Sequence, residues 1–142
     1  MRTEIASPGG LSIIVDASIA AKLLANEVDS GAATRLFAED RPLLAPDFMP
    51  IEVASAWWKK IRRGEMRLTQ AEQALADLVS SRIELRPSIV LLHGALQLAT
   101  NIGHSVYDCL YLALAVEHRA VLASADRRLR QVATTMGLGL WE

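Results

Sequence analysis

The sequence has one cysteine, few aromatic residues and no long apolar run. A single cysteine, Cys109, cannot form a disulfide within the chain, and this is typical of proteins from a reducing compartment. No segment reaches the roughly 18 consecutive apolar residues that a membrane-spanning helix needs. The first residues have no apolar core of a secretory signal either. We therefore expect a soluble, cytoplasmic protein with no membrane segment.

The sequence also lacks an excess of either charge, because its 142 residues have a formal net charge of −1. Proteins that hold nucleic acid over much of their surface usually have a basic excess, so the net charge argues against that class but leaves a local basic patch open. Hydrophobic residues make up 51% of the chain, which is enough to form the core of one domain of this length. We predict a flexible N-terminal arm at residues 1–12 and a single domain at residues 13–142.

Short apolar segments alternate with longer amphipathic segments along the chain. Strands are predicted at residues 12–15, 43–45, 83–85 and 121–123, with a terminal strand at 138–141. Helices are predicted at residues 17–25, 28–38, 48–63, 69–80, 88–100, 105–117 and 126–136. Apolar strands that alternate with helices form a parallel sheet covered on both faces. The predicted fold class is therefore α/β.

Some helix ends have recognisable signals. Asp47 stands before the helix predicted at 48–63, and Gly64 stands after it. Thr69 and Glu72 have the spacing of a capping box, in which two side chains accept hydrogen bonds from the first turn of a helix. We therefore expect Asp47 and Thr69 to begin two of the helices.

Four acidic residues are isolated in apolar sequence: Asp16, Glu52, Asp108 and Asp126. No Lys or Arg lies within three residues of the first three. An ionised carboxylate in apolar surroundings is costly unless another group compensates its charge. Asp16 and Asp126 follow predicted strands, so both belong at the edge of the sheet where ligands bind. We interpret the four acids as a site for a shared divalent cation.

Each acid also has a purely structural explanation. Asp16 and Asp126 stand where they would cap helices, and Asp108 lies three residues after Ser105, which is capping-box spacing. Glu52 would be an ordinary acid in the first turn of its helix, and capping explains it least. Because like charges in a cluster repel and raise one another's pKa, Mg²⁺ or Mn²⁺ would stabilise the four together.

Other common chemistries lack their motifs. The histidines are scattered, and no Cys or His cluster suits zinc, whereas a set of oxygen ligands suits Mg²⁺ or Mn²⁺. The chain has no Gly-x-Ser-x-Gly elbow, no phosphate-binding Gly-x-x-x-x-Gly-Lys loop and no Gly-x-Gly-x-x-Gly fingerprint. A phosphoacceptor receiver domain would have a second acid beside Asp16, where Ala17 stands.

Four motifs resemble, in this order, those of PIN domains, and the VapC-type toxin ribonucleases are the most similar branch. They are Ile-Val-Asp16-Ala-Ser18, Ile51-Glu52-Val53, Ser105-Val-Tyr-Asp108-Cys-Leu-Tyr111 and Leu122-Ala-Ser124-Ala-Asp126-Arg-Arg-Leu. The resemblance extends over residues 13–140. It implies a PIN-like three-layer α/β/α sandwich with a central parallel sheet, which agrees with the fold class predicted above.

The resemblance also implies a function. Such proteins are Mg²⁺-dependent (or Mn²⁺-dependent) endoribonucleases, the toxins of type II toxin–antitoxin systems, which cleave RNA with metal-activated water and leave a 5′-phosphate and a 3′-hydroxyl. By resemblance the catalytic and metal-binding residues are Asp16, Glu52, Asp108 and Asp126, and the supporting polar residues are Ser18 and Ser124. The implied partners are RNA, a small antitoxin and a second copy in a homodimer.

Two alternatives remain open. The first is a catalytically inactive PIN-like module that binds RNA or a protein, and the four complete acids count against it. The second is a DNA-directed nuclease of the same fold, because the same metal site can cut either backbone. Mg²⁺ binding and turnover on single-stranded RNA would separate these alternatives from the ribonuclease.

Two basic runs are candidates for RNA contact. Lys59 and Lys60 belong to one, and Arg127 and Arg128 to the other, which directly follows Asp126. A solvated helix face is the structural explanation, and contact with the phosphate backbone of RNA is the functional one. The position of Arg127 and Arg128 next to an acid of the proposed site favours them.

The few aromatic residues are predicted mainly as packing residues. Trp57 and Trp58 are adjacent on one helix, so they cannot face the same way. We expect one in the core and the other at an interface, with base stacking a less favoured alternative. Tyr107 and Tyr111 are at helical spacing and are predicted to pack, as is Cys109.

Overall fold

The structure is a computed structural model that describes residues 11–25 and 30–142. Most of the predicted arm at residues 1–12 therefore lies outside the described residues. Within the described ranges, no helix is both long and apolar enough to cross a membrane.

A parallel sheet of short strands lies at the centre of the molecule. Its strands are β1 (Ile13–Val15), β2 (Leu43–Pro46), β3 (Glu84–Arg86) and β4 (Val121–Ala123). Their order is β3-β2-β1-β4, and every neighbouring pair is parallel. β1 and β2 are buried along their whole length because each has a strand on both sides and helices over both faces. This burial explains why their sequences are apolar without alternation.

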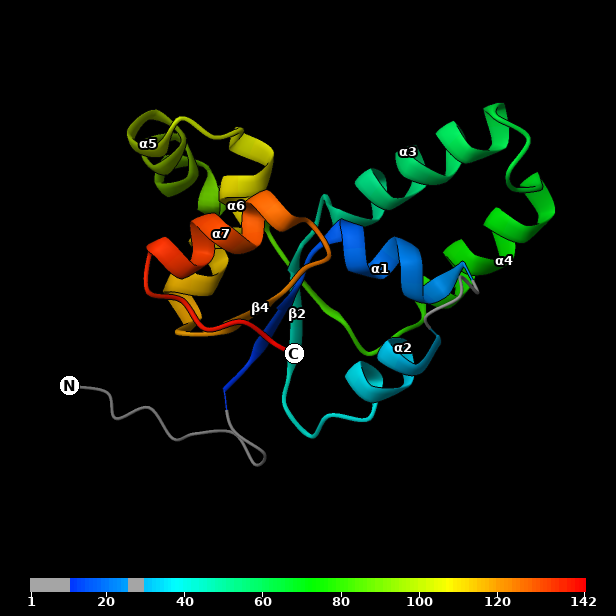
Figure 1. Ribbon diagram of the computed structural model, residues 1–142, viewed down its shortest axis with the longest axis horizontal. Helices are drawn as coiled ribbons and strands as arrows, with labels where there is room; N and C mark the ends of the chain where they lie inside the picture. Colours follow the sequence, from blue (N-terminus) through cyan, green and yellow to red (C-terminus); the bar gives the residue numbers. More distant parts are fainter. Residues whose placement is uncertain (1–10, 26–29) are drawn as a thin grey trace.

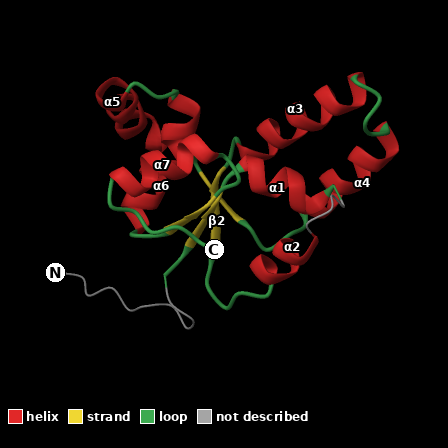
Figure 2. Cartoon of the chain, in the orientation of Figure 1, coloured by secondary structure: helices red, strands yellow, loops and turns green. Residues whose placement is uncertain are grey.

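Helices cover the sheet on both faces. They are α1 (Ala17–Leu24), α2 (Ser30–Phe37), α3 (Met49–Arg62), α4 (Leu68–Val79), the 3₁₀ helix η1 (Ser88–Leu91), α5 (Leu92–Ile102), α6 (Val106–His118) and α7 (Arg127–Thr135). Figure 1 shows α1 to α4 on one side of the sheet and α5 to α7 on the other. Figure 2 shows the strands crossing between these two helical layers. The predicted three-layer α/β/α sandwich is confirmed.

The apolar helix α6 lies against the middle of the sheet, in contact with β1, β2 and β4. It buries six of its thirteen residues, among them Cys109 and Leu112, each with no exposed surface. A helix that is apolar on most of its circumference has to be enclosed on most sides. The free cysteine is thus a core residue, as its sequence context indicates.

The two adjacent tryptophans divide as expected. Trp57 is 1% exposed and packs in the core, whereas Trp58 is 53% exposed. The indole N–H of Trp57 donates to the carbonyl oxygen of Ala21 at 3.2 Å, which joins α3 to α1. The ring of Trp58 lies on the surface under the guanidinium group of Arg62, 5.1 Å from the ring centroid.

Two predicted helix caps are wrong, although both helices begin within one residue of the predicted position. α3 begins after Phe48 with no side-chain cap, and the Asp47 carboxylate instead accepts from the Ser88 N–H at 3.0 Å. Hydrogen bonding with Ser88 holds the pKa of Asp47 below its ordinary value. α4 begins at Leu68, so Thr69 lies inside its first turn and no capping box forms there. Neither helix has a side-chain hydrogen bond at its N-cap.

The predicted terminal strand is also wrong in extent. Along residues 138–141, only Leu140 forms a bridge, in parallel with Leu122. Gly137 before it has a φ of 82°, and a Cβ on Gly139 would approach the Val121 side chain to 3.0 Å. The chain here follows the edge of β4 closely but pairs with it at a single point.

Candidate active site

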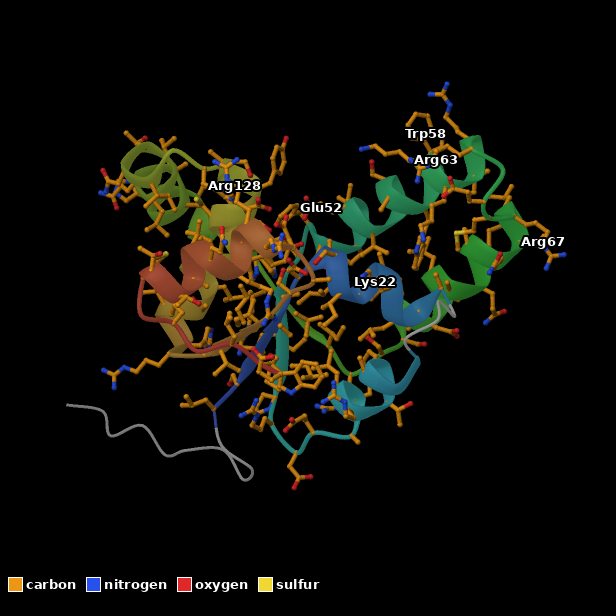
Figure 3. All side chains as sticks on the ribbon, viewed as in Figure 1. Lys22, Glu52, Trp58, Arg63, Arg67 and Arg128 are labelled. Carbon is orange, nitrogen blue, oxygen red and sulfur yellow. The ribbon has the colours of Figure 1, made fainter. Side chains whose placement is uncertain are left out.

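The four predicted acids lie at the carboxyl edge of the sheet. Asp16 follows β1, Glu52 lies in the first turn of α3 after β2, and Asp108 lies in the first turn of α6. Asp126 follows β4 and begins α7. Because the strands are parallel, α1, α3 and α7, which follow strands, begin at this one edge, and α6, which runs back to the start of β4, begins there too. Figure 3 shows Glu52 at the start of α3, with Arg128 of α7 across from it.

Asp16 is the buried acid of the group, with 4% of its surface exposed. Its Oδ1 accepts from the Ser18 hydroxyl at 2.6 Å and from the Ile19 N–H at 3.1 Å, which caps α1. Its Oδ2 accepts from the Ser124 hydroxyl at 2.6 Å. Burial raises the pKa of Asp16 despite these bonds, and the negative charge of Asp108 raises it further. The carboxylate is therefore fixed in position but costly to ionise.

The two serines join the ends of β1 and β4. The Ser18 hydroxyl accepts from the Ala125 N–H, and the Ser124 hydroxyl accepts from the Asp126 N–H, both at 3.0 Å. Each serine hydroxyl therefore accepts from a backbone N–H of the turn after β4 and donates to the Asp16 carboxylate, so it links the two. A hydroxyl is required for this because it donates and accepts at once.

Glu52 is half-buried and has one side-chain partner in the core. Its Oε1 accepts from the Tyr111 hydroxyl at 2.7 Å. Burial raises the pKa of Glu52, the Tyr111 hydrogen bond lowers it, and the charges of Asp108 and Asp16 raise it again. The charge of Asp108 thus acts on both Asp16 and Glu52, so the three carboxylates share one electrostatic environment.

Asp108 lies in the first turn of α6, and its side-chain partner is a histidine. Its N–H donates to the Ser105 hydroxyl at 3.1 Å, so Ser105 caps the helix as its sequence position indicates. The Asp108 Oδ2 lies 2.8 Å from Nε2 of His104, whose side chain is 5% exposed. Asp108 is thus held by a neighbouring ring instead of completing the predicted capping box.

Asp126 differs from the other three acids because it is exposed and caps α7. Its Oδ1 accepts from the Arg128 N–H at 2.9 Å and from the Leu129 N–H at 3.1 Å. It is connected to Asp16 through the Ser124 hydroxyl. The structure thus brings Asp16, Glu52 and Asp108 into one charged group and places Asp126 at its margin.

The donor set fits a hard divalent cation in its chemistry. It consists of carboxylate oxygens, which Mg²⁺ and Mn²⁺ prefer. Burial raises the pKa of Asp16 and Glu52, the charge of Asp108 raises both further, and a bound cation would offset both effects. Among the described residues, no three His, Cys, Asp or Glu side chains are close enough to hold an ion.

The predicted basic residues lie on both sides of this group. A shallow groove of about 330 Å³ on α3 is lined by Glu52, Ser55, Ala56, Lys59, Lys60 and Arg63. Arg127 and Arg128 are exposed in the first turn of α7, and Arg128 reaches the Gly103 carbonyl at 3.5 Å. The acidic Glu52 and the basic Lys59 and Lys60 thus line one surface of α3. Arg127 and Arg128 of α7 lie on the other side of the acids.

The sequence interpretation missed two side chains of this site. Tyr111 was expected only to pack, and His104 was treated as a scattered histidine, yet each contacts one of the acids. A signal for His104 exists, because it stands four residues before Asp108. No comparable signal exists for Tyr111, whose partner lies 59 residues away in the chain.

Comparison with known proteins places these features in context. Residues 13–134 match the family model described as PIN domain. The chain is 32% identical to Ribonuclease VapC3 of Pyrobaculum aerophilum over 123 residues, which cover 85% of this chain and 94% of that protein. The crystal structure of PAE2754 from Pyrobaculum aerophilum is similar with a TM-score of 0.64 and 28% identity, over 84% of this chain and 77% of that one.

A second solved structure supports the fold alone. It is the Mycobacterium tuberculosis toxin VapC20, whose structure is described as that of a sarcin-ricin loop cleaving toxin. The TM-score is 0.66 at 20% identity, over 84% of this chain and 94% of that one.

Proposed function

The chain belongs to the PIN-domain family, and from that premise we propose that it is a metal-dependent endoribonuclease, the toxin of a toxin–antitoxin pair. The relative named Ribonuclease VapC3 supports the reaction class. The observation that carries the proposal is the group of Asp16, Glu52 and Asp108 at the carboxyl edge of the sheet, where burial raises the pKa of Asp16 and Glu52 and the charge of Asp108 raises both further. A module without catalytic function would gain nothing from this repulsion.

The residues have distinct proposed roles. Asp16, Glu52 and Asp108 would hold a Mg²⁺ or Mn²⁺ ion, which supplies an activated water and stabilises charge on the phosphate. Asp126, at the margin, would contact a second ion or its water shell. Ser18 and Ser124 fix the Asp16 carboxylate by donating to both of its oxygens. Because these hydrogen bonds favour the ionised carboxylate, they oppose the effect of burial.

Metal removal is the direct test of this function. We expect the purified protein to cleave single-stranded RNA in Mg²⁺, to lose cleavage in EDTA, and to regain it when Mg²⁺ is added in excess. The cut RNA should have 5′-phosphate ends, which mapping of the fragments will detect. Cleavage that continues in EDTA would contradict the proposal. RNA binding without turnover would favour an inactive module, and preferential cutting of a matched DNA would favour a DNA-directed nuclease.

We propose that Lys59 and Lys60 of α3, with Arg127 and Arg128 of α7, contact the RNA backbone. Lys59 is exposed and lies seven residues after Glu52, so the two share one helix face about 10 Å apart along the axis. An electrostatic contact of this kind depends on salt, because it releases counterions.

Replacing Lys59 with Ala tests this contact. We expect weaker RNA binding in EDTA and a slope of log affinity against log salt that is smaller by about 0.7, the value for one phosphate of a single strand. Arg119→Gln is the control, because Arg119 is an exposed cation at the far end of α6, eleven residues from Asp108. Equal slopes for the two variants would show that Lys59 is only a solvated side chain.

The antitoxin and the homodimer are proposals that rest on the family resemblance. Purification of the tagged protein from its native host should recover a small second protein in a fixed ratio. Light scattering on the isolated chain should give twice the monomer mass. A monomer at all concentrations would rule out the dimer, and recovery of the chain alone would count against the antitoxin.

A further inference from the structure

A buried phenol lies directly behind Glu52. Tyr111, in the second turn of α6, is 1% exposed, and its hydroxyl donates to Glu52 Oε1 at 2.7 Å. Packing explains the ring, whose centroid is 5.3 Å from that of Phe48. Packing does not explain the hydroxyl, since a phenylalanine would fill the same space without placing a polar atom in the core.

The direction of this hydrogen bond follows from its two groups. An ionised carboxylate can only accept, whereas a phenol hydroxyl can donate, so Tyr111 donates to Glu52. Tyr111 thus connects α6 to α3.

Glu52 needs such an anchor more than the other acids do. Asp16 receives hydrogen bonds on both oxygens, and Asp126 is fixed by capping α7. Glu52 has a longer side chain, is half-buried and caps nothing, and the hydrogen bond from the Tyr111 hydroxyl ties its carboxylate to the core. Holding one oxygen removes rotamer freedom before a ligand binds, which is the basis of preorganisation.

We propose that Tyr111 is a positioning residue, which holds Oε1 of Glu52 and so directs this carboxylate toward Asp16 and Asp108. The inference rests on the proposed function, because it assigns Glu52 to the metal-binding group. Side chains that orient metal ligands from behind typically contribute 10–100-fold to metal affinity or activity. The hydroxyl should matter by that amount, while the ring should matter for folding.

Tyr111→Phe removes the hydroxyl and keeps the ring, and Tyr107→Phe is the matched control. Tyr107 lies one turn earlier on α6, is 64% exposed and also contacts Phe48, at 5.9 Å. For Tyr111→Phe we expect 10–100-fold weaker Mn²⁺ binding by calorimetry on the metal-free protein and a similar loss of kcat. RNA affinity in EDTA should be unchanged. Values within twofold of those for Tyr107→Phe would overturn the inference.

A double-mutant cycle with Glu52→Ala separates positioning from packing. If Tyr111 acts through Glu52, then Tyr111→Phe should change Mn²⁺ binding by less than twofold once Glu52 is absent. An undiminished effect would mean that the hydroxyl acts elsewhere and would overturn the inference. The same cycle in urea unfolding tests the contact in the metal-free protein, where equal midpoint shifts in both backgrounds would contradict it.

Failure of the proposed function has a different signature. A wild-type protein that neither binds Mn²⁺ nor cuts RNA would contradict the metal-dependent nuclease, whatever Tyr111 does. An active wild type with an equally active Tyr111→Phe variant would contradict only the role of Tyr111.

Discussion

Replacing Asp16 with Asn is expected to lower Mg²⁺-dependent RNA cleavage by more than about 100-fold, the upper range for residues that only orient a ligand. Asn keeps the shape of Asp and still caps a helix, so Ile19 keeps its acceptor. The amide group that replaces Oδ2 can donate to the Ser124 hydroxyl, which already accepts from the Asp126 N–H. The substitution therefore removes the charge without disturbing the local structure. Cleavage assays at saturating RNA will measure the effect.

Stability against pH provides an independent measurement on the same variant. Burial raises the pKa of Asp16 above its ordinary value of 3.8, so the folded protein favours the protonated form. The stability that this provides is fully present below pH 3.8 and is lost as the pH rises through the raised pKa. Without metal, Asp16→Asn should therefore become more stable relative to the wild type as the pH rises across that range.

Asp77→Asn is the matched control for Asp16→Asn. Asp77 lies on the exposed face of α4, where its carboxylate accepts from Gln73 at 3.2 Å. We expect the control to cleave RNA at the wild-type rate and to unfold with the wild-type pH dependence. An Asp16→Asn protein that is folded and cleaves RNA within tenfold of the wild type would show that Asp16 is no more than a helix cap.

Replacing Trp57 with Ala is expected to cost about 3–5 kcal/mol of the free energy of unfolding, as large-to-small changes of core aromatic residues do. Trp57 is 1% exposed and connects α3 to α1 through its bond to Ala21. Domains of this size are stable by only about 5–15 kcal/mol, so the variant should be near its limit of folding at 37 °C. Urea unfolding followed by circular dichroism will give the value.

The neighbouring tryptophan is the natural control. Trp58→Ala removes a side chain that is 53% exposed and whose contact is the guanidinium group of Arg62. An exposed contact of this kind contributes about 0.5–1 kcal/mol, so the loss should stay near that range. If both variants lost equal stability, Trp57 would not be the core residue that the structure shows.

Local sequence patterns predicted the architecture well because they reflect local physical requirements. The strand at Ile13–Val15 is buried along its whole length, and its unbroken apolar sequence indicates this directly. Ser105 and Asp126 cap helices as predicted, since an N-cap requires only one side-chain acceptor within reach. Such short-range rules depend on residues that are already neighbours in the chain.

Prediction failed where a residue had competing partners. Aspartate is a common helix cap, but the Asp47 carboxylate instead accepts from the N–H of Ser88, which is distant in sequence and lies just after β3. The strand predicted at residues 138–141 is reduced to a single bridge between Leu140 and Leu122. Neither partner can be identified from the residues alone.

The sequence by itself determined the parallel α/β sandwich, the positions of the four acids at helix starts, and the motifs that resemble a PIN domain. Those properties follow from periodicity, capping and strand burial within short windows. The tertiary structure alone decided that Asp16, Glu52 and Asp108 share one electrostatic environment while Asp126 lies at its margin. It alone placed the Tyr111 hydroxyl behind Glu52. A contact such as that of Tyr111 with Glu52, 59 residues apart, depends on how the helices pack over the sheet. No local sequence pattern indicates that packing.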